Sequence, residues 1–363
     1  MTDTAENLYN KGDTFHADED LENAEKFYKQ ALKIDPNHYL SLRWLADIYL
    51  DQEKYTKAIE LFEQAKMVND KDPDLYNDLG LCYYEDYQYK ESLDNYKAGL
   101  LIKSNNETIH SNLGKALYEY HIEDKSSAKE FAKWWKDGFP DSNDAQVIAS
   151  AILGENLAEQ NKEYVKQIFD DFAEDFDEKL AELDYKAPEL LSAIWKKHNK
   201  DKVSKILDAG CGTGLLSPHI NNACDYLHGV DLSAEMLELA KSRELYCDLS
   251  ASDLIEYLNN NINEFNGVIA SDVLCYFGDL NEVFNKTYDT LQSGSYFAFT
   301  NEENLTNDND FFLTPSGRYT HKQSYIESVL TNNNFEVIEI NNATLRTEHG
   351  NPVKGLISIA KKP

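Results

Sequence analysis

Residues 205–214 read Lys-Ile-Leu-Asp-Ala-Gly-Cys-Gly-Thr-Gly, and Asp231 stands seventeen residues after the last of these glycines. A short apolar run leads into the glycines, and a helical pattern follows from Leu215. Because glycine has no Cβ, it suits a backbone that turns sharply and approaches a ligand closely. A helix that begins after a strand offers free N–H groups to a nucleotide-like ligand, and a carboxylate after the next apolar run can hold two ribose hydroxyls. The stretch therefore predicts a ligand-binding turn between a strand and a helix of an α/β domain.

The spacing of the glycines separates several interpretations. A glycine-rich turn of any α/β domain is the plainest one. A dinucleotide-binding loop needs G-x-G-x-x-G, whereas this loop reads G-x-G-x-G with Asp208 two residues before the first glycine. A P-loop needs a Lys-Ser or Lys-Thr pair after the glycines, which does not follow here. The pattern D-x-G-x-G-x-G, followed by V-D-L-S-x-x-M-L, resembles motifs I and II of class I S-adenosylmethionine (SAM) methyltransferases.

This resemblance implies S-adenosyl-L-methionine as the cofactor and assigns a set of residues to it. In such enzymes an acidic residue and an N–H group after the third strand hold adenine, which points to Asp253 and Leu254, with Ser252 beside them. Capping of the helix predicted over 254–259 is the alternative role for Ser252 or Asp253. The residues implied by the first two motifs are Asp208, Gly210, Cys211, Gly212, Gly214, Asp231, Leu232 and Met236.

Length and charge limit the classes of function. A chain of 363 residues favours two domains over one core. The net charge of −30, from 65 acidic and 35 basic residues, argues against a nucleic-acid binder, which needs a basic face, and against binding to an anionic membrane. Solubility explains the acidity, with a cationic partner as the alternative.

The N-terminus and the cysteines indicate the compartment. The first ten residues lack a basic and apolar leader, and no apolar run is long enough to span a bilayer. The five cysteines are scattered without a C-x-x-C pair, which predicts neither a metal site nor a disulfide framework. We therefore expect a cytoplasmic enzyme with free thiols and no metal, no nucleic-acid partner and no membrane insertion.

The first third of the chain repeats with a period of 34 residues. Small residues recur at Ala24, Ala58 and Ser92, and an aromatic residue stands four positions after each of them. The repeats start near residues 5, 39 and 73, and a fourth unit begins near residue 107 but loses register after residue 121. Small residues let two antiparallel helices approach closely while aromatic rings fill the gaps. This pattern resembles the tetratricopeptide (TPR) repeat.

The repeats suggest how the chain is divided. We expect three TPR repeats and a partial fourth over residues 1–122, a helical cap or linker over 123–160, and the methyltransferase domain over 161–363. The array either serves assembly, including a homo-oligomer, or binds a protein or peptide in its concave groove. Trp134 and Trp135 are predicted to pack between domains, with a groove anchor as the alternative.

A segment ahead of the glycine loop resembles predicted methyltransferases that often carry TPR repeats. The string F-D-D-F-A-E-D-F-D-x-x-L-x-x-L-x-Y-x-A-P-x-L-L carries the resemblance. Periodicity predicts one helix from Glu163 to Leu183 and a second after Pro188. In such relatives the segment covers the SAM pocket, which implies that Tyr185 approaches the cofactor. Packing at a helix junction is the alternative role of this tyrosine.

The alternation of strands and helices continues after Asp231. Ser233 is predicted to cap a helix, and the resemblance implies seven strands that end in an antiparallel hairpin. The predicted fold is thus an N-terminal TPR α-solenoid followed by a Rossmann-like class I methyltransferase domain with a seven-stranded, mostly parallel sheet. The strands are expected at 245–249, 267–274, 295–300, 335–341 and 355–360, in addition to the two that flank the glycine loop, and helices at 279–291 and 324–330.

The acceptor side rests on weaker signals. Ligands of open α/β sheets bind at the carboxyl ends of the strands, so Ser271 and Asp272 should line the methionyl side, with Tyr276 facing the acceptor. Two loop strings, 317–321 and 345–355, resemble the same predicted methyltransferases. They place Arg318, Tyr319, His321, Arg346 and Glu348 on loops that could face the acceptor.

These residues allow two interpretations of the acceptor side. An arginine with a nearby acid can hold a carboxylate or phosphate in a bidentate way, whereas a salt-bridged hairpin is the structural alternative. A base is needed only if the acceptor loses a proton, and the pKa of histidine makes His321 the first candidate, followed by Tyr276.

Three functions remain open from sequence. The first is methyl transfer to a small molecule, with the repeats serving assembly or partner binding. The second is methylation of a protein or peptide that the TPR groove presents, and the third is a non-catalytic TPR adaptor with a SAM-binding domain. The sequence does not name the acceptor atom, because that choice depends on loops outside the cofactor motifs.

Overall fold

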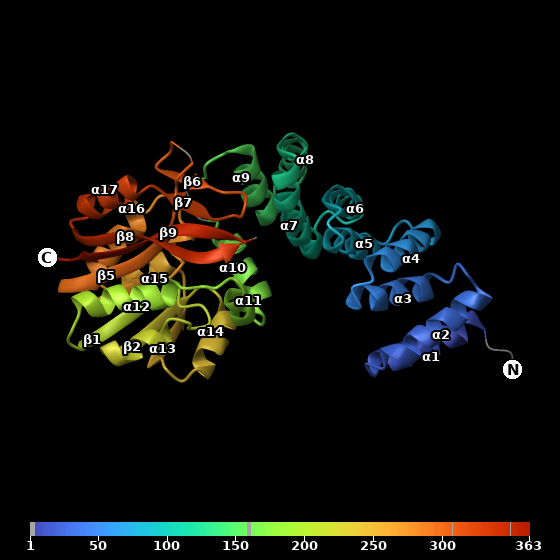
Figure 1. The fold of residues 1–363 in the computed structure, drawn as a ribbon, viewed down its shortest axis with the longest axis horizontal. Helices are drawn as coiled ribbons and strands as arrows, with labels where there is room; N and C mark the ends of the chain where they lie inside the picture. Colours follow the sequence, from blue (N-terminus) through green and yellow to red (C-terminus); the bar gives the residue numbers. More distant parts are fainter. Residues whose placement is uncertain (1–3, 158–160, 307, 349) are drawn as a thin grey trace. The chain divides into compact units, whose positions relative to one another are not determined.

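The computed structural model of the chain describes residues 4–157, 161–306, 308–348 and 350–363. The chain divides into two compact units, Met1–Leu153 and Gly154–Pro363. The first is an array of helices and the second an α/β unit (Figure 1). The division falls inside the predicted linker 123–160, of which residues 158–160 lie outside the described part. None of the helices in the described ranges is both long and apolar enough to cross a membrane.

The first unit consists of helix pairs that follow the 34-residue period. The first helices of the pairs begin at Ala5, Tyr39, Pro73 and Glu107, which confirms the predicted starts. The helices are α1 (Ala5–Ala17), α2 (Leu21–Ile34), α3 (Tyr39–Asp51), α4 (Tyr55–Val68), α5 (Pro73–Glu85), α6 (Tyr89–Ile102), α7 (Glu107–Glu123), α8 (Lys125–Gly138), a π-helix (Ala145–Ala149) and α9 (Ser150–Leu153).

The 34-residue pattern loses register after residue 121, but the pairing of helices continues. Helix α8 packs against α7 as a fourth pair, and its buried residues are out of register with those of the earlier repeats. Ala128, Ala132 and Trp135 form its buried stripe, and the Trp135 indole donates a hydrogen bond to His110 Nδ1 of α7 at 2.9 Å. The contact between Trp135 and His110 thus joins the two helices of this pair. In the earlier pairs an aromatic ring that packs on a small residue joins them.

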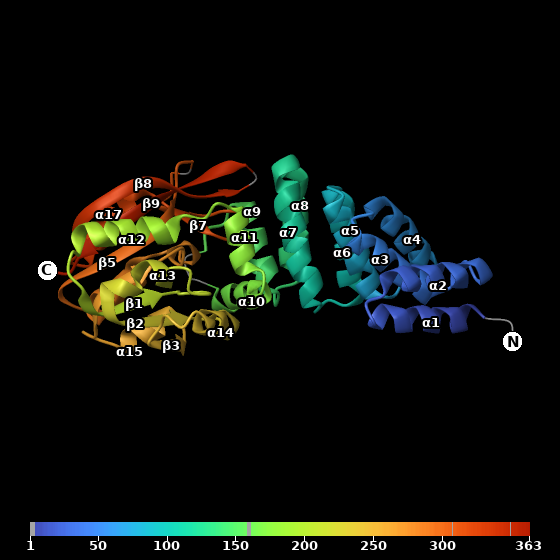
Figure 2. The same ribbon diagram turned by 60° about the horizontal axis from the view of Figure 1, so that its bottom comes forward.

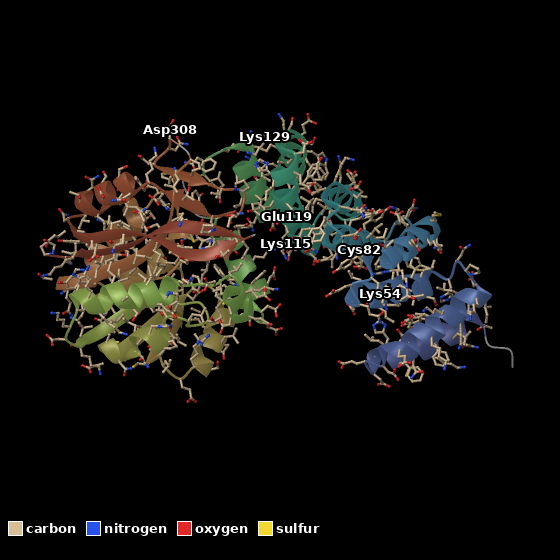
Figure 3. The ribbon with its side chains drawn as sticks, viewed as in Figure 1. Lys54, Cys82, Lys115, Glu119, Lys129 and Asp308 are labelled. Carbon is tan, nitrogen blue, oxygen red and sulfur yellow. The ribbon has the colours of Figure 1, made fainter. Side chains whose placement is uncertain are left out.

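Each early pair is held by an aromatic ring that packs on a small residue. A Cβ built on Gly12 would lie 2.7 Å from the Tyr28 ring, and one on Gly80 would lie 2.5 Å from the Tyr96 ring. The second repeat carries Ala46 instead at the equivalent position. Cys82 of α5 lies in the same core with no exposed surface (Figure 3), and burial raises the pKa of its thiol.

We expect Gly80→Ala to destabilise the array. The added methyl would overlap the buried Tyr96 ring, and overpacking of this kind costs about 1–3 kcal/mol, which exceeds the ~1 kcal/mol gained in helix propensity. Gly138→Ala, at the end of α8, serves as the control, because a Cβ on Gly138 meets nothing within 4 Å. Thermal unfolding should show a lower Tm for Gly80→Ala and no such loss for Gly138→Ala; an unchanged Tm for Gly80→Ala would contradict this packing.

The second unit contains a sheet between two layers of helices. Its helices are α10 (Lys162–Phe172), α11 (Phe176–Glu182), α12 (Ala187–His198), α13 (Ser217–Ile220), α14 (Ala234–Ser242), α15 (Leu254–Asn260), α16 (Asn281–Thr290) and α17 (Gln323–Asn332). Its strands are β1 (Val203–Ala209), β2 (Cys224–Asp231), β3 (Asp248–Ala251), β4 (Phe265–Ala270), β5 (Leu291–Glu303), β6 (Phe311–Leu313), β7 (Tyr319–His321), β8 (Glu336–Glu348) and β9 (Asn351–Lys361).

The order of the strands places the glycine loop at a switch point. Strands β3, β2, β1, β4 and β5 lie side by side in this order and are parallel. The direction of strand addition changes between β1 and β4, next to the loop that follows β1. Strand β9 is antiparallel to both β5 and β8. Ligands of such sheets bind beside this point, at the carboxyl ends of the strands.

Alternating side chains divide the core into two layers. Leu207, Val268 and Phe297 face the layer that contains α15, α16 and α17. Ile206, Ile269 and Ala298 face the opposite layer, which contains α12 (Figure 2). Trp195 of this helix is fully buried. The two apolar faces fix the register of the strands, because a slip of one residue would exchange them.

Three predicted elements differ from the structure. The single helix over 163–183 is two helices, α10 and α11, with a break at residues 173–175. The helix after Leu215 is only the four residues of α13, which contain a proline. The sheet has nine strands within the described ranges instead of seven, because β6 and β7 form an additional hairpin. Strand β7 pairs with β5 beyond the end of β4.

Candidate functional site

The carboxylate of Asp231 joins the two loops at the centre of the site. Its Oδ2 accepts the N–H of Gly212 at 2.8 Å, and its Oδ1 accepts the N–H of Ser233 at 2.9 Å. Ser233 in turn caps α14 through the N–H of Met236, as the sequence predicts. Leu232 lies half-buried in this turn, and Met236 has no exposed surface.

The glycine loop uses most of its N–H groups internally. The N–H groups of Gly210 and Cys211 both donate to the carbonyl of Val230, at 2.8 and 3.0 Å. Gly210, Gly212 and Gly214 have φ of +69°, +52° and +84°, a region that disfavours residues with a side chain. A Cβ on Gly210 would also meet Val273 at 2.4 Å. The loop is therefore a fixed turn and not a cradle of free N–H groups for phosphates.

Asp208 leaves one buried oxygen without a partner. Its side chain is 1% exposed, Oδ2 accepts a hydrogen bond from the Tyr246 hydroxyl at 2.6 Å, and Oδ1 has no hydrogen bond. Burial raises the pKa of Asp208 to about 7; the Tyr246 hydrogen bond opposes this rise and the nearby Asp231 adds to it. A buried acceptor of this kind is suited to a cationic or hydrogen-bonding ligand group.

The residues after β3 lie beside the Asp231 turn. The N–H of Ser252 donates to the carbonyl of Asp231 at 2.9 Å, and Leu254 is buried at the start of α15. Asp253 caps α15 by accepting the N–H of Glu256 at 3.0 Å, as in the capping interpretation. Its carboxylate also forms an ion pair with Lys162 of α10 at 3.0 Å.

Tyr185 reaches the carboxyl end of β4. Backbone hydrogen bonds between residues 183–186 and β8 fix its position: Lys186 N–H donates to Leu345 O at 2.8 Å, and Thr347 N–H donates to Leu183 O at 2.7 Å. The Tyr185 hydroxyl then lies 2.9 Å from Ser271 Oγ. Burial raises the pKa of this hydroxyl well above its ordinary value, so Tyr185 is neutral at physiological pH.

Two arginines and three acidic residues, one of which is Asp272, form a connected cluster of ion pairs. Arg346, with a 4% exposed side chain, pairs with Asp272 Oδ2 at 3.0 Å, with Glu348 at 2.7 Å and with Glu302. Arg318 pairs with Glu302 at 2.8 Å and with Glu348. Three acidic residues thus surround the two guanidinium groups. The two arginines thus form the ion-paired arrangement that the sequence leaves open as the structural alternative.

The two candidate bases have different surroundings. His321 has no exposed surface; its Nε2 lies 2.9 Å from Phe277 O and 3.1 Å from Gly278 O, so this nitrogen carries the proton. Burial lowers the pKa of His321 to about 4, and we do not retain it as a base. Tyr319 is also buried, and its hydroxyl donates to Leu157 O at 2.7 Å. Tyr276 follows β4, and its ring lies 5.3 Å from that of Phe169 of α10.

The structure brings most predicted residues to one edge of the sheet. The glycine loop, the Asp231 turn, residues 252–254 and residues 271–272 follow four adjacent parallel strands. Sequence reasoning missed Tyr246 and Glu302, which contact Asp208 and the two arginines. It also missed Asp170, whose Oδ1 accepts a hydrogen bond from Ser233 Oγ at 2.6 Å. The acidic face of the 163–183 segment was the available signal for Asp170.

Two family models match this chain. Residues 206–294 match the model described as "Methyltransferase domain", and residues 15–79 match the one described as "Tetratricopeptide repeat". The chain carries a methyltransferase domain. The predicted TPR repeats and methyltransferase domain are thus confirmed as domains of this chain.

Curated methyltransferases match a part of this chain. A methyltransferase of Geobacillus sp. (strain WCH70) is 25% identical over 142 residues, covering 36% of this chain and 56% of that protein. Malonyl-[acyl-carrier protein] O-methyltransferase of Salmonella typhimurium is 24% identical over 144 residues, covering 40% of this chain and 55% of that protein. The chain therefore spans about half the length of these curated relatives.

A solved structure is also similar to part of this chain. The Burkholderia thailandensis 1,6-didemethyltoxoflavin-N1-methyltransferase, with 1,6-didemethyltoxoflavin and S-adenosylhomocysteine bound, has 18% identity and a TM-score of 0.44. The similarity covers 55% of this chain and 89% of that chain.

The methyltransferase domain has groups that suit SAM. The unpartnered Oδ1 of Asp208 is suited to an ammonium group, and the turn residue Asp231 to ribose hydroxyls. Asp253 and the start of α15 provide a carboxylate and backbone groups for a base. Within the described ranges, no cluster of three or more His, Cys, Asp or Glu residues could hold a metal ion.

We expect Asp208→Asn to change how stability depends on pH. The folded state raises the pKa of Asp208 to about 7, so between about pH 4 and 7 the folded protein holds a proton that the unfolded chain has lost. The free energy of unfolding contributed by this group falls as pH rises through that window. Asn cannot titrate, so the Tm of the variant relative to that of the parent should increase from about pH 4 to about pH 7 and stay constant above about pH 7. A constant difference in Tm across this range would contradict the raised pKa.

Proposed function

We propose that the protein is a SAM-dependent methyltransferase that acts on a small molecule. The observation that carries the proposal is the combination of an internally bonded glycine loop with the unpartnered, buried Asp208 oxygen. A dinucleotide would need free loop N–H groups for its pyrophosphate, whereas SAM has no phosphate and carries an ammonium group. SAM supplies an activated methyl group, and the protein aligns the acceptor with it and excludes water.

The cluster around Arg346 supports an acceptor that is neutral or cationic. Three carboxylates already occupy both arginines, so an anionic acceptor would have to displace an internal ion pair. Removing a partner from a buried ion pair leaves an uncompensated charge, which is strongly unfavourable. Arg346 and Glu302 are also buried, which suits a compact acceptor better than an extended protein segment.

The cofactor proposal predicts binding that depends on Asp231. Asp231→Ala removes the acceptor for two loop N–H groups, and we expect a loss of SAM affinity of about 10²-fold or more, because buried donors lose their partner as well. Isothermal titration calorimetry with SAM measures this loss directly. Asp225→Ala, at an exposed position near the start of β2, is the control and should bind like the parent. Absence of binding by the parent, or equal binding by Asp231→Ala, would refute the cofactor site.

The acceptor proposal predicts which material is methylated. Cell extract is separated into small molecules and proteins, and the small molecules are divided by ion exchange into anionic, neutral and cationic fractions. With radiolabelled SAM, the full chain should label the neutral or cationic small-molecule fraction. Label in the anionic fraction would contradict the role given to the cluster. Label in the protein fraction that is lost on deletion of residues 1–153 would favour a protein substrate presented by the repeats.

A further inference from the structure

Three residues that are distant in the sequence close a ring around the glycine loop. Thr213 Oγ1 donates to Asp177 Oδ1 of α11, and Arg243 Nε donates to Thr213 O at 2.5 Å. The Arg243 guanidinium completes the ring with an ion pair to Asp177. One side chain thus holds the hydroxyl of Thr213 and the other holds its carbonyl.

The ring contacts the glycine loop at Thr213. Thr213 is 1% exposed and stands between Gly212 and Gly214, both of which have positive φ. The Arg243 chain also packs on the loop, since its Cδ lies 3.2 Å from the position of a Cβ on Gly214. On the other side, the Phe176 ring at the start of α11 lies 3.9 Å from the position of a Cβ on Gly212. Orientation of the Thr213 peptide therefore depends on α11 and α14 together.

We propose that Asp177 and Arg243 are positioning residues for the cofactor, an inference that rests on the proposed SAM site. They hold α11 against the glycine loop and fix the loop in the conformation that receives the cofactor. The Asp177 and Arg243 side chains are 47% and 24% exposed, and such pairs contribute only about 0–1 kcal/mol to global stability. Their effect should therefore appear in cofactor affinity and release much more than in unfolding.

Helix α10 makes two other polar contacts, which are less suitable for a test of positioning. Lys162 pairs with Asp253, and Asp170 accepts a hydrogen bond from Ser233. These contacts reach residues that are themselves candidate cofactor ligands or their immediate neighbours, so substituting them would mix positioning with direct binding. Neither Asp177 nor Arg243 is a candidate cofactor ligand, and this pair isolates the contribution of positioning.

The experiment is a double-mutant cycle on binding of S-adenosylhomocysteine to the full chain. Asp177→Asn, Arg243→Gln and the double variant are compared by calorimetry, with dissociation rates from stopped flow and Tm without ligand. We expect each single variant to weaken binding about tenfold, mainly through faster dissociation, and the double variant to lose little more, since coupled residues do not add. Arg243→Lys keeps the charge but not the two-point contact, and it should be intermediate.

A matched control removes a comparable ion pair of α11. Glu182→Gln breaks the exposed pair with Lys179, at 3.4 Å, which does not touch the loop, and it should bind like the parent. The inference is overturned if Asp177→Asn and Arg243→Gln bind like the parent, or if the cycle shows coupling in Tm but none in affinity. If the parent itself does not bind, the proposed cofactor site fails and this inference fails with it.

Discussion

The carboxylate of Asp231 is the contact on which the candidate site depends. By accepting the N–H groups of Gly212 and Ser233, it joins the loop after β1 to the turn after β2. Because Ser233 caps α14 and the N–H groups of Gly210 and Cys211 bond to Val230, the loop, the turn and the helix form one hydrogen-bonded unit. This unit lies where the strand order reverses, so one acidic side chain organises the end of the sheet at which ligands bind.

The acceptor side follows a different electrostatic rule from the cofactor side. Asp208 keeps one of its two oxygens without a partner, whereas each charge around Arg346 has partners within the protein. The first arrangement is suited to a ligand, and the second stabilises the ends of β5 and β8 and limits the charge that an acceptor can bring. The helical array is stabilised in a different way, because in its helix pairs aromatic rings pack against small residues.

Local patterns predicted the parts of the structure that depend on local contacts. The 34-residue period located the helix pairs, and the residues around Ser233 located the cap of α14. Periodicity did not predict the break between α10 and α11. The apolar stripe over residues 163–183 is continuous, but Asp170 and Asp177 make polar contacts with loops that are distant in the sequence. The β6–β7 hairpin and the Arg346 cluster depend on pairing between β5, β7 and β8, which no window of sequence contains. For the same reason the sequence left the role of the arginines open and did not name Glu302 as their partner.

The central claim is that the glycine loop, Asp231 and Asp208 together bind the nucleoside and ammonium groups of SAM. A crystal structure of the chain grown with S-adenosylhomocysteine tests it most directly. The account predicts that the ribose lies against Asp231, the ammonium group lies at Asp208 Oδ1, and the base lies beside Asp253. Density for the ligand at another place, or an empty loop in crystals saturated with the ligand, would contradict it.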